Sequence, residues 1–150
     1  PRKILPFVGG HHIISEWMTF KYFKINHRII RPIIPVILKS STNVVLYSAL
    51  IDSGSDYCIF GLDVASGLDI KLRSKNKIRF IGVGKEEIEG FWSEIEIRTD
   101  NKAYQAKIIF ADISDVGYGI LGQQGFFDHF DVKLSYNNLS INIEPIKLKN

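Results

Sequence analysis

The sequence predicts an all-β fold, either a barrel or a sandwich. Apolar runs rich in Val, Ile, Tyr and Phe recur along the chain, and turn-forming residues separate them. Helical signals are few and short. At 150 residues, with no linker-like or low-complexity stretch, the chain is long enough for one domain with its own core.

The expected strands share the β-branched and aromatic residues that favour extended backbone. They are 19–25, 33–38, 44–51, 77–81, 91–98, 104–110, 131–134 and 139–143. Two pairs should form hairpins, through a polar turn at Lys39–Asn43 and a tight turn at Asn137-Asn138 with positive φ. Pro32 and Pro35 place the first hairpin strand at an edge or a bulge.

Two segments are candidates for short helices. Gly61–Gly67 reads as one or two turns that end at a glycine, and Gln123–Phe130 reads as another short helix. The expected architecture is therefore strands with one or two short helices.

The composition limits which partners and locations can be expected for this chain. The net charge is +3, and its positive residues are scattered without an aromatic-interleaved cluster, so we expect no nucleic-acid partner. No apolar run has the length of a membrane span, and the N-terminus lacks the pattern of a signal peptide. Cys58 is the single cysteine, which excludes an internal disulfide and favours a cytoplasmic location.

No metal site or cofactor is expected. His11, His12, His27 and His129 lack Cys or acidic partners at zinc-ligand spacing. Cys58 lies in an apolar run without a nearby histidine, which is typical of a buried thiol rather than a nucleophile.

The segment Ala49–Ser55 (ALIDSGS) carries the strongest chemical signal. It places the carboxylate of Asp52 directly after an apolar strand, and Gly54 permits a sharp turn there. Asp, Ser and Gly are also the usual residues of a plain strand-to-turn exit. The context favours chemistry, because a glycine-containing hairpin and an apolar loop ending in Gly follow downstream.

These three segments together resemble the retropepsin-like aspartic proteases, over roughly residues 31–143. Residues 31–55 resemble the segment with the family's Asp-Thr/Ser-Gly motif, and 80–91 resembles its flap hairpin. Gly119-Ile120-Leu121-Gly122 resembles its second loop. The resemblance implies a closed or partly open barrel of the acid-protease type. It divides the chain into a protease domain at 31–150 and an N-terminal extension at 1–30, packed on that domain.

The resemblance also implies an aspartic endopeptidase that acts on a peptide or protein substrate. Such chemistry needs two carboxylates that share a proton, and this chain has one motif. Asp52 from each chain of a homodimer would then meet on the twofold axis. Ser53 would brace the two loops, and the Gly54 carbonyl would accept a substrate N–H. A hydroxyl at Ser55 could donate to Asp52, which predicts an acidic pH optimum.

The rest of the site is less directly indicated. Gly82, Val83 and Gly84 are expected at the flap bend, where the backbone could pair with an extended peptide. Ile120, Leu121 and Gly122 form the second loop. Gln123 stands where viral members often carry a basic residue that pairs with an acid, for which Asp56 is the candidate. The alternative function is an inactive module that kept the fold for dimerisation or peptide binding.

Overall fold

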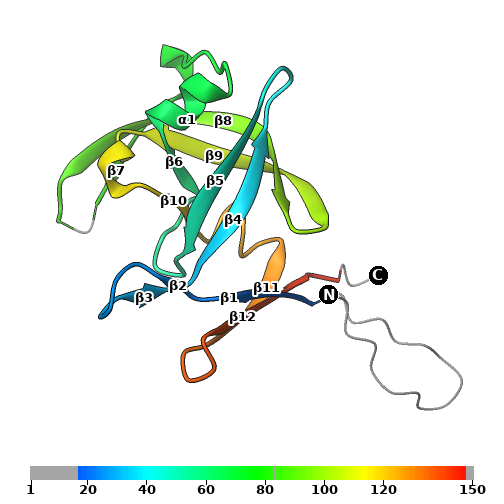
Figure 1. The fold of residues 1–150 in the computed structure, drawn as a ribbon. Helices are drawn as coiled ribbons and strands as arrows, with labels where there is room; N and C mark the ends of the chain where they lie inside the picture. The colour runs from blue at the N-terminus through cyan, green and yellow to red at the C-terminus, as the bar shows by residue number, and fades with distance from the viewer. Residues whose placement is uncertain (1–16, 83, 148–150) are drawn as a thin grey trace, which may run out of the picture.

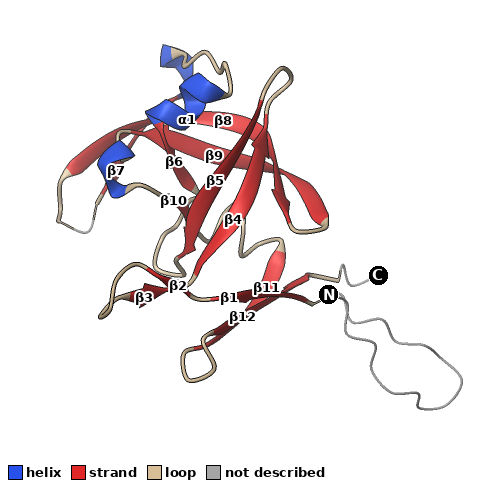
Figure 2. Cartoon of the chain, in the orientation of Figure 1, coloured by secondary structure: helices blue, strands red, loops and turns tan. Residues whose placement is uncertain are grey.

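A computed structural model describes residues 17–82 and 84–147, and strands make up most of it (Figure 2). The predicted all-β class is confirmed. The strands of the main sheet form a ring, and a smaller sheet lies beside one end of it (Figure 1).

The ring contains the strands that lead into the predicted loops. Its members, in spatial order, are β4 (Ile33–Lys39), β5 (Val44–Ile51), β10 (Gly119–Leu121), β6 (Ile59–Gly61), β9 (Lys102–Ala111) and β8 (Glu87–Thr99). The ring closes because β8 also pairs with the end of β4, at Ile37–Lys39. Closure leaves β7 (Lys77–Ile81) as an outer strand, paired with β8 alone in the described sheet.

The first hairpin follows the predicted pattern closely. In β4 the side chains of Ile34, Val36 and Leu38 are buried, while Pro35 and Ile37 between them are exposed. This period-two alternation is that of a strand with one face on a core. Pro35 precedes the residues that pair with β8, as expected of a residue that cannot donate to a second neighbouring strand.

The smaller sheet has the order β1 (Met18–Lys21), β12 (Ser140–Pro145) and β11 (Phe130–Ser135). All of its pairings are antiparallel. A two-stranded ribbon, β2 (Phe23–Lys24) with β3 (Ile30–Arg31), connects it to β4. The part of the expected N-terminal extension that is described, from Trp17 onward, thus contributes one strand to this sheet; residues 1–16 lie outside the described residues.

One predicted helix is present. The helix α1 (Leu62–Gly67) follows β6 directly and buries Val64 and Ala65 against the barrel. Two single 3-10 turns, η1 (Ser74–Asn76) and η2 (Ser114–Val116), complete the described helical structure.

Four expectations about local structure were wrong. Gln123–Phe130 forms successive turns instead of a helix, because Gly125 adopts φ +98° and interrupts helical geometry. The single strand expected at 19–25 is divided at Tyr22, whose N–H donates to the carbonyl of Leu139 at 2.9 Å. In the last hairpin the positive φ lies at Leu139 (+48°) and not at the two asparagines. The second loop, 119–121, is itself a strand, β10.

Apolar side chains form two clusters. The larger fills the barrel and continues under the small sheet, with Phe60, Phe110 and Phe126 among its fully buried members. The smaller is centred on Ile59, Ile109 and Ala111. Among the described residues, no helix has the length and apolar character needed to cross a membrane.

Candidate active site

Asp52 is fixed by the strand that precedes it. Ile51, the last residue of β5, is buried, and its N–H donates to the Pro32 carbonyl at 2.9 Å. The N–H of Asp52 donates to the carbonyl of Leu121 at 3.0 Å. The carboxylate therefore emerges from a backbone held on both sides, and the side chain is half-buried.

The loop after Asp52 is tied back to its carboxylate. The N–H of Gly54 donates to Oδ1 of Asp52 at 2.9 Å, and the N–H of Ser55 donates to the Asp52 carbonyl at 3.2 Å. A charged acceptor strengthens the first of these hydrogen bonds. Ser53 and Gly54 lie exposed at the outside of the turn, where another molecule can contact them.

The predicted second loop lies directly beside the first. β10 pairs in parallel with the end of β5, with Leu121 opposite Ile51 and Ile120 opposite Leu50. Leu121 is buried in the main core, whereas Ile120 is half-buried and packs against the smaller apolar cluster.

Gly122 allows the two loops to approach closely. A Cβ at this position would lie 2.3 Å from the carbonyl oxygen of Tyr57 and 2.6 Å from that of Ser55. These are backbone atoms that cannot move aside. The Gly122 N–H donates to the Cys58 sulfur at 3.3 Å, so the thiol is a hydrogen-bond acceptor in the loop contact.

Gln123 joins the two loops through both its main chain and its side chain. Its N–H donates to the Ser55 carbonyl at 2.8 Å, and Nε2 donates to the Ser53 carbonyl at 2.7 Å. Gln123, noted in the sequence as standing in place of a basic residue, thus binds the loop as a neutral donor. Sequence reasoning noted the replacement but missed this contact, because a single glutamine carries no signal for its partner.

Ser55 differs from the expectation. Its hydroxyl donates to the carbonyl of Tyr57 at 2.8 Å. A hydroxyl has one proton to donate, so the predicted hydrogen bond from Ser55 to Asp52 is absent from this chain. Ser55 instead stabilises the backbone that leads from the loop into β6.

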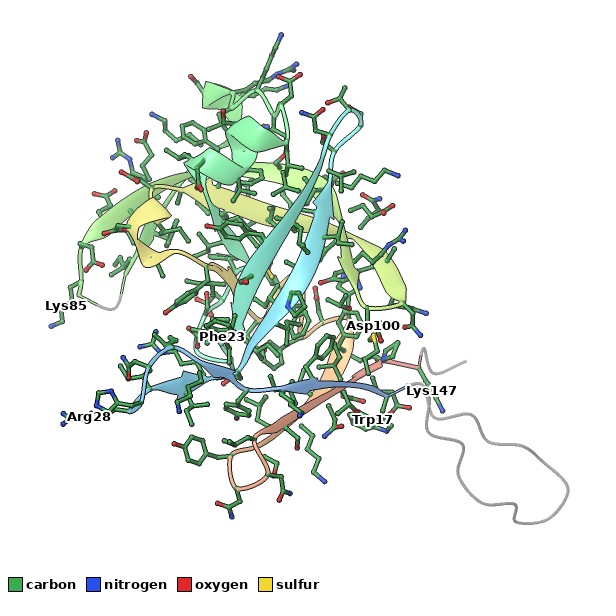
Figure 3. The ribbon with its side chains drawn as sticks, in the orientation of Figure 1. Trp17, Phe23, Arg28, Lys85, Asp100 and Lys147 are labelled. Carbon is green, nitrogen blue, oxygen red and sulfur yellow. The ribbon has the colours of Figure 1, made fainter. Side chains whose placement is uncertain are left out.

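The hairpin expected around 80–91 is present as β7 and β8. Its bend is closed by the N–H of Gly82, which donates to the Glu86 carbonyl at 2.9 Å, and Lys85 adopts φ +65°. Lys85 stands at the tip, away from the barrel (Figure 3). Gly82 begins this bend and Gly84 lies within it, while Val83 lies outside the described residues.

The smaller apolar cluster connects this hairpin to the two loops. Ile78, Phe80 and Ile88 of the hairpin pack against it from one side. Ile120 and Ile59, which are cross-strand partners, belong to it on the other side. A cluster of buried and half-buried apolar side chains therefore extends from β10 to the hairpin.

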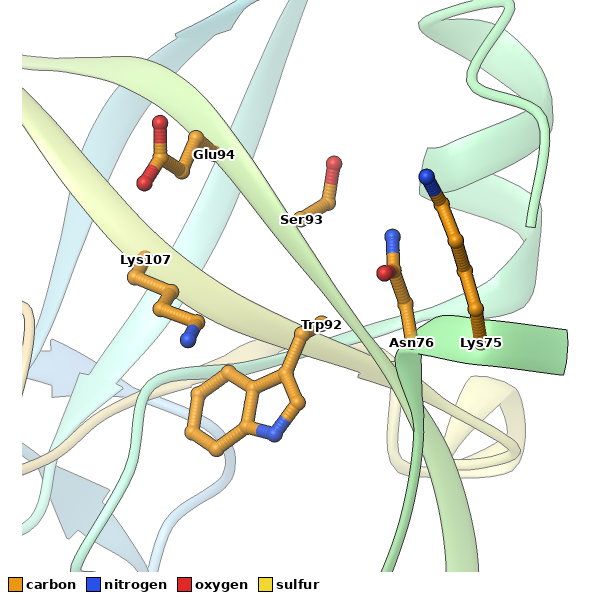
Figure 4. A pocket seen from close by; sticks show the side chains of 6 residues that line it. All are labelled: Lys75, Asn76, Trp92, Ser93, Glu94 and Lys107. Carbon is orange, nitrogen blue, oxygen red and sulfur yellow. The ribbon is translucent and has the colours of Figure 1, made fainter. Parts of the chain in front are cut away.

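A separate pocket lies on the outside of β8 and β9 and contains no predicted site residue (Figure 4). Lys107 lies over the ring of Trp92, with Nζ 4.9 Å from its centroid, and Tyr57 contacts the same ring edge-on. Lys75, Asn76, Ser93 and Glu94 complete the lining. Its mixed charges do not select one class of ligand.

No protein-family model matches this chain, and no curated protein sequence matches it. Solved structures do. A retropepsin-like aspartic protease from Rickettsia conorii matches with a TM-score of 0.58 at 11% identity, over 85% of this chain and 98% of that one. The EIAV protease in complex with the inhibitor HBY-793 matches with a TM-score of 0.49 at 22% identity, over 67% of this chain and 88% of that one. The chain has a retropepsin-like fold.

Proposed function

We propose that this chain is an aspartic endopeptidase that acts as a homodimer, with Asp52 of each chain forming the catalytic pair. The observation that carries the proposal is the environment of Asp52. Its carboxylate follows the buried residue Ile51 and accepts an N–H from Gly54, and the backbone N–H of Asp52 donates to Leu121 at the end of β10. A plain turn could form the Asp52–Gly54 hydrogen bond by itself. It needs no links to a second loop, such as those from the Asp52 N–H to Leu121 and from the Gln123 side chain to Ser53.

The chemistry requires the two carboxylates to share a proton. The charged carboxylate removes a proton from a water molecule, and the oxygen of that water attacks the scissile carbonyl carbon. The protonated one donates to the carbonyl oxygen as charge develops there. The first carboxyl, now protonated, passes its proton to the amide nitrogen, and the C–N bond breaks. A hydroxyl proton of the tetrahedral intermediate returns to the second carboxylate, so that the pair again shares one proton.

A second chain completes the site in this proposal. The loop that carries Asp52 is exposed at Ser53 and Gly54, so the same loop of a partner can approach across a twofold axis. The Ser53 hydroxyl is available there to brace the partner's loop. The Gly54 carbonyl is available to a substrate N–H.

The smaller apolar cluster beside the loops suggests that the substrate carries apolar side chains. Ile120 lies on β10, the strand next to β5, and Ile59 lies opposite it on β6. Ile78 and Ile88 of the hairpin pack against the same cluster. Bulky apolar side chains flanking the scissile bond would bury surface there. The hairpin backbone near Gly82 and Gly84 would pair with the extended peptide.

Asp52→Asn tests the proposal. It preserves the size of the side chain and removes the titratable group, so kcat on apolar peptides should fall about 10³-fold or more. The melting temperature should change little. A peptide mimic with a central hydroxyl in place of the scissile amide should inhibit the wild-type chain.

Asp63→Asn is the matched control. It makes the same Asp-to-Asn change at an exposed residue of α1. It should retain wild-type turnover. Full activity in the Asp52→Asn chain would reject the catalytic assignment. A stable wild-type dimer that binds peptides but never cleaves them would favour the inactive module.

A further inference from the structure

The peptide group between Ser53 and Gly54 is hydrogen-bonded at both ends. Its N–H, on Gly54, donates to Oδ1 of Asp52 at 2.9 Å. Its C=O, on Ser53, accepts from Nε2 of Gln123 at 2.7 Å. One planar unit thus connects the Gln123 amide to the Asp52 carboxylate.

We infer that Gln123 is a positioning residue for the catalytic aspartate, acting through this peptide group; the inference rests on the proposed peptidase function. A donor at the carbonyl end polarises the peptide and strengthens the N–H donation at the other end. It also restrains the peptide plane, so that the Gly54 N–H stays directed at Asp52.

The orientation of the amide is fixed by its partner. The Ser53 carbonyl can only accept, so the nitrogen end of the Gln123 side chain must face it. The Gln123 main chain, bonded to the Ser55 carbonyl at 2.8 Å, holds the side chain beside the loop. This anchoring matters because the side chain is exposed, where water competes for the hydrogen bond.

A glutamine does this without a charge of its own. The carboxylates on the same two segments are Asp52 and Asp56 on the loop and Asp128 on the turns, where Asp128 accepts from Gly125 N–H and lies 3.7 Å from His129. Arg31, at the end of β3, is bonded to the Tyr118 hydroxyl before β10. The amide group of Gln123 does not gain or lose a proton at the pH values at which carboxylates and histidines titrate.

Gln123→Met removes the donor at nearly constant size. We expect kcat/KM to fall about tenfold, mainly through kcat, since the loss of one such hydrogen bond has roughly this effect. A weaker Gly54 donation favours the charged carboxylate less, so the acidic limb of the pH–rate profile should move to higher pH. A merely structural role would lower the melting temperature and leave that limb in place.

Gln123→Glu and Gln123→Lys test the donor directly. Glutamate is nearly isosteric but accepts only while it is charged, so its activity relative to Gln123→Met should rise as the pH falls and it becomes protonated. Lysine keeps a donor and should restore most of the wild-type kcat. Gln124→Glu adds the same charge at the next, exposed side chain and should match wild type.

Amide hydrogen exchange at Gly54 provides a readout that does not need activity. In folded Gln123→Met protein this amide should exchange faster than in wild type, and Gln123→Lys should restore its protection. Unchanged exchange and an unchanged pH–rate profile in Gln123→Met would overturn the inference. Wild-type protein without peptidase activity would instead reject the proposed function, while the exchange measurement would still test the hydrogen-bonded link.

Discussion

Cys58 contributes to the site without any part in its chemistry. Its thiol is fully buried, accepts the Gly122 N–H, and would be 3.1 Å from a Cβ added at Gly125. Burial raises the pKa of the Cys58 thiol from 9.0 to about 12. The sequence interpretation of a buried, unreactive thiol agrees with this environment.

This shift predicts a pH dependence of stability. Between about pH 9 and 12 the unfolded chain loses the thiol proton and the folded chain keeps it, so the folded state binds more protons. Its free energy of unfolding should therefore fall as the pH rises, by about 1.4 kcal/mol per pH unit from this group. Urea unfolding of wild type and Cys58→Ala from pH 8 to 11 measures the difference between them. A difference that stays constant with pH would contradict the expected shift.

At the level of elements, the β7–β8 hairpin depends on how closely β8 packs against its antiparallel neighbour β9. Gly90 lies within β8, and a Cβ there would be 2.4 Å from Cγ2 of Ile109 and 3.1 Å from the Phe110 carbonyl oxygen. Ile109 is fully buried, so it has little room to move. The close approach of the strands keeps the hairpin packed against the smaller apolar cluster.

Gly90→Ala should therefore destabilise the fold by about 1–3 kcal/mol, through overpacking. Thermal unfolding checks this expectation. Gly84→Ala is the control on the same hairpin, because the atoms within 4 Å of its added Cβ belong to the exposed, flexible Glu86 side chain. Equal melting temperatures for the two variants would show that the packing around Gly90 can relax.

At the scale of the whole molecule, a barrel supplies the framework and the exposed loop supplies half of a proposed site. Parallel pairing of β5 with β10 aligns the ends of the two strands, and both loops start from there. In this framework the backbone of Asp52 is held against β10, as the proposed dimer would require.

Subunit mixing tests the proposed dimer independently of any dimer structure. Wild-type chains should be mixed with about a threefold excess of Asp52→Asn chains and allowed to exchange partners. If each site needs Asp52 from both chains, activity per wild-type chain should fall to about a quarter. Asp63→Asn chains in the same excess should not lower it. Activity that is unaffected by the Asp52→Asn excess would mean that one chain suffices.

The sequence alone determined the strand class and the position of the proposed catalytic motif. The alternation of buried and exposed residues in β4 and the apolar run of β5 are local patterns, so their assignments could be made without tertiary information. The strands at 44–51 and 77–81 have the predicted bounds for the same reason.

Only the tertiary structure decided which groups meet at Asp52. β6 and β10 are three residues each, too short for a periodic signal, and they become strands because neighbours on both sides pair with them. Ser55 and Gln123 could each have bound several acceptors, and the choice depended on where the second loop came to lie. Hydrogen bonds between segments about 70 residues apart depend on the closed barrel, which no local pattern in the sequence encodes.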